Sequence, residues 1–174
     1  MSFFESYKSS ILKEFKYYKA LGDKSFAQLE VDDFYTSVNE YSNSIAIIMK
    51  HMQGNMLSRW TDFYTSDGEK EWRQRDAEFE EERLDKATLL ANWEAAWNCL
   101  FAVLEPLEES DLQRIVTIRN EPHTVIQAIN RQLAHYPYHV GQIVYLAKEI
   151  KGAAFPSLSI PKNASQAFNQ KLMK

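Results

Sequence analysis

Two histidines with helical spacing are the residues of this chain best placed to do chemistry. His135 and His139 lie four positions apart, and on a helix such residues share one face, one turn apart. Their imidazoles can therefore point at the same cation. The residues between them, Tyr136, Pro137 and Tyr138, lack the acid that follows the first histidine in the zinc-protease motif. The pair predicts a metal site of another kind, with a surface or packing role as the alternative.

A third histidine, His51, lies in an earlier helical segment beside the apolar positions Ile48 and Met52. Three neutral imidazoles from two helices leave one or more coordination positions open, as in catalytic zinc sites. A cation in such a site lowers the pKa of a water molecule or holds a thiolate. Imidazole ligands suit zinc, nickel, iron and copper, so the sequence predicts a divalent metal ion without fixing its identity.

Three polar residues near these histidines are candidates for a substrate pocket. Asn55 follows His51 by one helical turn, Arg59 follows it by two turns, and Arg131 precedes His135 by one turn. Either arginine can hold a carboxylate or a phosphate, with a surface salt bridge as the alternative for each. No pattern identifies a general base, so the catalytic residues stay unassigned.

Four segments in which apolar residues recur every three or four positions predict long helices. The chain has only 5 glycines and 5 prolines, few for an all-β protein. We therefore expect an all-α fold, a helical bundle forming one domain over residues 1–174. The predicted helices cover residues 2–21, 32–63, 86–104 and 123–151.

Single positions within these segments carry further expectations. Gly22 suits a C-terminal cap of the first helix, and Gly54 marks a close approach of another group to the second. Val38 and Tyr41 belong to the predicted core stripe of the second helix. Pro137 should bend the fourth helix or open one of its backbone hydrogen bonds. His123 lies on the wrong side of that helix to join the other histidines, and we expect it to face solvent.

The segments outside the helices are polar or short. Residues 65–85 form a long, charge-rich connection, and the acidic run from Glu78 to Glu82 within it should be a solvated face. Residues 114–119 alternate and include β-branched side chains, which predicts a short extended piece. The tail, residues 153–174, is expected to pack on the bundle as a lid or an edge cover.

Composition excludes several classes of function. The formal net charge of −4 gives no electrostatic reason to expect nucleic acid as a partner. The single cysteine, Cys99, fits a reducing compartment. No stretch is apolar for long enough to cross a membrane, and the N-terminus lacks the pattern of a signal peptide. We therefore expect a cytoplasmic protein.

The chain resembles the DinB/YfiT-like superfamily over nearly its whole length, and most closely an uncharacterised bacterial branch of it. The resemblance implies a left-handed four-helix bundle in up-down-down-up order, often dimeric, with a long connection between helices 2 and 3. It also implies metal ligation by His51, His135 and His139. Better-studied members are transferases and isomerases that use low-molecular-weight thiols such as bacillithiol or mycothiol. The stretches that carry the resemblance are residues 49–56, 59–63, 67–70, 75–79 and 128–143.

Three kinds of function are consistent with these observations. The first is a metal-dependent enzyme, a thiol-dependent transferase or a hydrolase, acting on a small molecule as a homodimer. The second is a non-enzymatic metal-binding or stress-response accessory protein. The third is a helical interaction module in which the histidines are incidental. None of the three involves nucleic acid or a membrane.

Overall fold

The computed structural model describes residues 1–172, which form a mostly helical fold with one small two-stranded sheet. The expectation of a mostly helical fold is confirmed, and the small sheet is an addition to the all-α fold that we expected. The last two residues of the tail 153–174 lie outside the described part. The elements that matter below are α1 (Phe3–Phe26), α2 (Ile45–Trp60), α3 (Lys86–Leu104), β1 (Ile115–Ile118), β2 (Glu121–Thr124), α4 (Val125–Lys151) and α5 (Ser165–Leu172).

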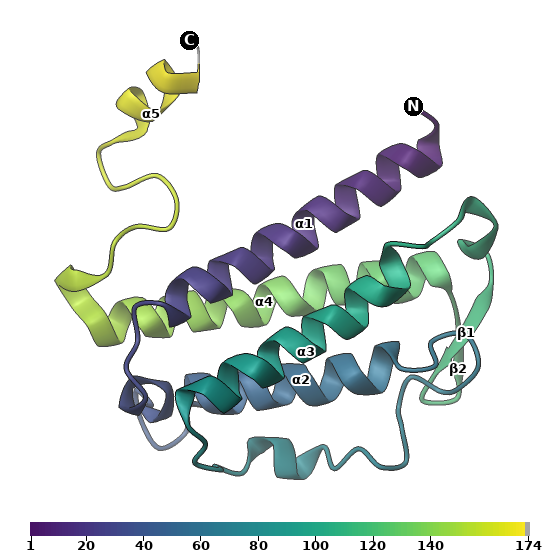
Figure 1. Cartoon of the computed structure of the whole chain (residues 1–174), viewed down its shortest axis with the longest axis horizontal. Coiled ribbons are helices and arrows are strands. Elements are labelled where there is room, and N and C mark those ends of the chain that lie inside the picture. Colours follow the sequence, from purple (N-terminus) through teal and green to yellow (C-terminus); the bar gives the residue numbers. More distant parts are fainter. Residues whose placement is uncertain (173–174) are drawn as a thin grey trace.

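The four long helices pack as two pairs. The most extensive packing joins α2 to α3 and α1 to α4, and smaller contacts join α2 to α4 and α1 to α3. In Figure 1, α2 and α3 both begin at the end of the bundle where α1 finishes, and α4 begins at the opposite end. Large aromatic side chains from all four helices meet in the core, which is fully buried at Phe15, Trp60, Trp97 and Tyr136.

The first helix is longer than its sequence indicates. We expected it to end near Leu21 with Gly22 as its cap, but α1 continues to Phe26. Gly22 is instead the place where α3 comes close. A Cβ atom there would lie 2.6 Å from Cζ2 of Trp93, which is closer than real contacts allow. The glycine therefore serves helix packing rather than helix termination.

The second helix is shorter than predicted, and part of its predicted core stripe was wrong. It begins only at Ile45, because the Ser44 hydroxyl accepts a hydrogen bond from the backbone N–H of Ile47 and caps the helix. Upstream of this cap the chain forms a short 3₁₀ helix and a loop, where Val38 and Tyr41 are 57% and 91% exposed. The prediction rested on the spacing of apolar residues alone, and it therefore carried the helix past the start that Ser44 sets.

A β-hairpin precedes the fourth helix. The extended piece expected over residues 114–119 is confirmed as β1, which pairs antiparallel with β2 in a register that sets Val116 opposite His123. We predicted the start of the helix in place of β2. The helix begins later because Thr124 and Gln127 cap it reciprocally through their side chains and backbone N–H groups.

The long connection after α2 is tied to the tip of this hairpin. Asp67 accepts hydrogen bonds from the backbone N–H groups of Arg119 and Asn120, at 2.9 and 2.8 Å. Both of these residues have positive φ angles, 55° and 61°, which form the tight turn between the strands. The connection then runs back along α2, where a second 3₁₀ helix, Asp76–Phe79, packs on it.

The C-terminal tail covers the bundle only at its beginning. Phe155 is buried, whereas Ile160 and Phe168 are 42% and 41% exposed. Figure 1 shows α5 extending away from the four long helices. The expectation of a lid thus fails for most of the tail. Within residues 1–172, no helix combines the length and apolar character needed to span a bilayer.

Candidate metal centre

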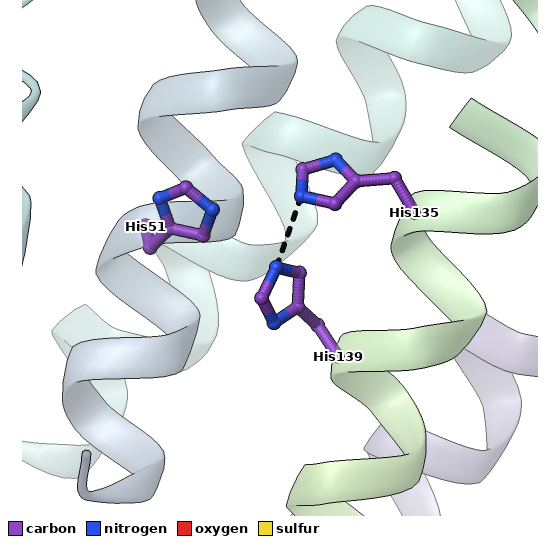
Figure 2. A group of neighbouring side chains, drawn as sticks. All are labelled: His51, His135 and His139. Atoms are coloured by element: carbon purple, nitrogen blue, oxygen red, sulfur yellow. Dashed lines mark hydrogen bonds between the residues drawn. The ribbon is translucent and has the colours of Figure 1, made fainter. Parts of the chain in front are cut away.

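The structure brings His51, His135 and His139 together between α2 and α4 (Figure 2). One ring nitrogen from each lies within 4.8 Å of the corresponding nitrogens of the other two. The two histidines of α4 are closest, with 3.0 Å between their Nε2 atoms. His51 is buried and the other two are half-buried, so the cluster is only partly exposed to solvent.

Each of these imidazoles is held by a side-chain oxygen on its far nitrogen. The Nδ1 atom of His51 bonds to Oε2 of Glu78 at 2.9 Å. Those of His135 and His139 bond to the amide oxygens of Gln132 and Gln142, at 3.2 and 2.8 Å. A carboxylate or amide oxygen only accepts, so each Nδ1 carries a proton, and in a neutral ring this leaves the lone pair on Nε2. This second layer of partners is the one that metal-binding histidines usually have.

The protonation states also suit a cation. Burial lowers the pKa of His135 to about 3, and the neighbouring imidazoles and arginines add to the effect. Burial likewise lowers the pKa of His139, against the opposing bond to Gln142. Both rings are therefore neutral at pH 7, the form that binds metals. The Nε2 atoms of His135 and His139 lie 3.0 Å apart, so a single cation could contact both rings.

Glu78 is the functional residue that sequence reasoning missed. The acidic run containing it was expected to be solvated, yet Glu78 is only 6% exposed. The Arg73 guanidinium donates to both its carboxylate oxygens, at 2.7 and 2.9 Å. Burial by itself raises the pKa of Glu78, but the bonds from His51 and Arg73 outweigh it and hold the pKa below the usual value of 4.5. The carboxylate is therefore charged at neutral pH.

A signal for this contact was present in the sequence at Gly54. The expected close approach to that glycine is confirmed, because a Cβ atom there would lie 2.1 Å from Oε1 of Glu78. Gly54 lies three residues after His51 on α2, so it leaves space for the carboxylate that orients this histidine. The sequence indicated a close approach to Gly54 but did not identify Glu78 as the residue that makes it.

The three predicted pocket residues line one cavity of about 490 Å³ beside the histidines. Asn55 is 6% exposed, and its side-chain oxygen accepts a hydrogen bond from the Tyr136 hydroxyl at 3.1 Å. Arg59 is 3% exposed rather than on the surface, and burial lowers its pKa. Arg131 is exposed at the cavity wall. His51 and His135 belong to the same wall, so the cavity reaches the cluster.

His123 does not join the other three histidines. It lies on β2, half-buried, rather than at the start of a helix in solvent. Among the described residues, the group that can hold a metal ion consists of His51, His135 and His139.

Fold and site together define a mostly helical protein in which three imidazoles cluster between α2 and α4, beside a cavity lined largely by polar side chains. The chain belongs to the family described as "Protein of unknown function (DUF1572)", whose model matches residues 2–164. Comparisons with curated proteins and with solved structures find no match.

Proposed function

We propose that this chain is a metal-dependent enzyme of the DinB/YfiT-like type, in which His51, His135 and His139 hold one divalent cation. The observation that carries the proposal is that one ring nitrogen from each of the three histidines lies within 4.8 Å of the other two, while the Nδ1 atom of each ring is bonded to a side-chain oxygen. Up-down-down-up topology belongs to the same proposal and is supported by the directions of the helices in Figure 1.

Zinc, nickel and iron are the metals that suit this donor set. When bound, a cation with three imidazole ligands supplies a Lewis acid that lowers the pKa of a water molecule or a thiol. The adjoining cavity of about 490 Å³ favours catalysis over a purely structural role, because a closed structural site needs no such access. We propose two alternative reactants. One is a small thiol, for a transfer reaction, and the other is a water molecule, for a hydrolysis.

The residues around the cluster have separate tasks in this proposal. Glu78, Gln132 and Gln142 fix the orientation and the tautomer of the three imidazoles. Asn55 faces the cavity, and the Tyr136 hydroxyl occupies its amide oxygen, which leaves the amide nitrogen to donate to a reactant.

Metal binding is tested directly on the purified protein. The chelated protein should take up one equivalent of zinc, and cobalt in its place should give the visible spectrum of a tetrahedral or five-coordinate site. His51→Ala should abolish tight binding, and His123→Ala is the matched control that should leave it unchanged. Equal zinc affinity in His51→Ala and in the unaltered chain would show that the three-histidine site is wrong.

Catalysis is tested separately, by a screen of low-molecular-weight thiols against electrophiles and of hydrolysable esters and amides, with and without chelator. Chelator-sensitive turnover supports the enzyme. Stoichiometric metal without any turnover favours the second candidate, an accessory metal-binding protein. The homodimer, which rests on the superfamily resemblance, is tested by light scattering on the same samples.

A further inference from the structure

The cavity next to the histidine cluster is strongly basic. Five guanidinium groups line it, and none of its described lining residues is a carboxylate. They come from three parts of the chain: α2, α4 and the loops that pack against them. The five are Arg59, Arg73, Arg75, Arg119 and Arg131.

Two of these arginines are already neutralised. Arg73 pairs with Glu78 and with Glu69, and Arg119 pairs with Glu69 at 3.2 Å. Over residues 1–172, no salt bridge reaches the other three. Arg75 lies over the Phe79 ring at 5.5 Å, and Arg59 and Arg131 have no acidic partner at all in this part of the chain. The cavity therefore has an excess of positive charge.

Arg59 is the most informative of the three. It is 3% exposed, yet its Nε and Nη1 atoms are buried without a hydrogen-bond partner among the described residues. A buried charged group without partners is strongly unfavourable, so such a group calls for an explanation. Gly68 allows the guanidinium to lie where it does, since a Cβ there would come within 2.5 Å of Nη1. The absence of a side chain at Gly68 thus leaves space for the Arg59 guanidinium, whose Nε and Nη1 atoms have no partner among the described residues.

The positions of the arginines relative to the histidines set the size of a ligand. Arg131 lies one turn from His135 on α4, and Arg59 lies two turns from His51 on α2. At a rise of 1.5 Å per residue, these separations along the helix axes are about 6 and 12 Å. A ligand held by the arginines would therefore extend over about 6–12 Å to reach the cluster, a length that suits a cavity of about 490 Å³.

We propose that this cavity binds a small anion with at least two negative charges, whose carboxylate or phosphate groups are held by Arg59 and Arg131. Arginine suits both groups because its planar fork donates two parallel hydrogen bonds. The reacting end of the anion points to the histidines, and in this respect the inference rests on the proposed function. The substrate class is thus a small acidic metabolite that carries at least two negative charges.

Calorimetric titration of the chelated protein with succinate and with inorganic phosphate tests this inference without any activity. Tighter binding of succinate assigns the site to carboxylates, and tighter binding of phosphate assigns it to phosphoryl groups. Arg59→Gln and Arg131→Gln should each weaken the preferred anion by about 10-fold or more, as expected when one charge-assisted pair is lost. Arg83→Gln is the matched control, because it removes the same charge from an exposed ion pair outside the cavity, and it should change affinity less than about 2-fold.

A melting experiment separates ligand binding from a structural role. Without an anion, Arg59→Met should melt at or above the temperature of the unaltered chain, because it removes an unpaired buried charge. A large fall in melting temperature would instead show that Arg59 stabilises the fold, and it would overturn the inference. Failure of the unaltered chain to bind either anion at millimolar concentration, or unchanged affinity in both arginine variants, would overturn it as well.

The same samples distinguish this inference from the proposed function. His139→Ala, whose side chain is not among those that line the cavity, should lose zinc but keep its affinity for the anion, and Arg59→Gln should bind the anion about 10-fold or more weakly but keep zinc. If the unaltered chain binds the anion and takes up no zinc, the metal site is wrong and the anion site stands.

Discussion

The carboxylate of Glu78 offers the sharpest test of how the histidine cluster is held. Glu78→Gln keeps the shape of the side chain but replaces the charged acceptor that fixes His51 at 2.9 Å. Loss of such a second-layer partner typically weakens metal binding by about 10–100-fold. We therefore expect the zinc dissociation constant of the variant to rise by about that factor, while the stoichiometry stays at one.

The same substitution also affects the stability of the chain. Glu78 accepts two bonds from Arg73, whose side chain is only 2% exposed. Removal of one partner from a buried pair costs about 3–5 kcal/mol when the other is left alone. Arg73 keeps its pair with Glu69, so we expect a smaller loss in the free energy of unfolding, about 1.5–3 kcal/mol.

The pH dependence of this loss has a definite sign. The folded chain holds the pKa of Glu78 below its usual value of 4.5, so the stabilisation is fully present above pH 4.5. It disappears as the pH falls through the lowered pKa. The difference in unfolding free energy between Glu78→Gln and the unaltered chain should therefore be largest near pH 7 and shrink as the pH falls below 4.5.

The assay is zinc competition with a chromophoric chelator, at a temperature where circular dichroism shows both proteins folded. Glu80→Gln is the matched control, because it makes the same change two residues away on an exposed side chain. Unchanged zinc affinity in Glu78→Gln, or an equal loss in Glu80→Gln, would refute the role given to this carboxylate.

Four further substitutions test other contacts of the site and its support. Gly54→Ala should displace the Glu78 carboxylate, because the added Cβ would lie 2.1 Å from it, and should weaken zinc binding several-fold. Gly141→Ala should instead stabilise α4 by about 0.5–1 kcal/mol, because the added Cβ meets nothing within 4 Å. Tyr136→Phe should cost about 1–3 kcal/mol in thermal or denaturant unfolding, because the buried N–H of Trp60 loses its acceptor, with little change in zinc affinity. Partial burial raises the pKa of Asp67, but hydrogen bonds from backbone N–H groups of the loop and the hairpin outweigh this effect and lower the pKa below 3.8. Asp67→Asn should therefore destabilise the chain at pH 7, and the loss should become progressively smaller as the pH falls below about 3.8.

Spacing along a helix predicts the neighbours within α2 and within α4, whereas the meeting of His51 with the α4 histidines was implied by the family resemblance. His135 and His139 share a face of α4 by spacing alone, and Asn55 follows from His51 in the same way on α2. Glu78 could not be predicted because it reaches His51 across 27 positions, through a loop whose path depends on tertiary contacts. The local sequence around it, rich in acids, favours a solvated segment.

Helix boundaries show the same division between local and distant causes. The start of α2 could have been predicted from Ser44, since capping is a local interaction, but the apolar spacing upstream of it suggested a longer helix. The extension of α1 beyond Gly22 was not accessible, because the reason for that glycine lies on α3. Strand β2 was missed because we expected the fourth helix to start directly after Pro122, whereas the pairing of residues 121–124 depends on β1.

The placement of the histidines on α2 and α4 has a mechanical consequence for the bundle. Each of these helices packs most extensively on another partner, α2 on α3 and α4 on α1. A cation shared by His51, His135 and His139 therefore joins two halves of the molecule that are otherwise less tightly connected. At a free concentration 1,000 times its dissociation constant, such a ligand adds about 4 kcal/mol to folding. How firmly the halves stay closed would then depend on the supply of metal in the surroundings.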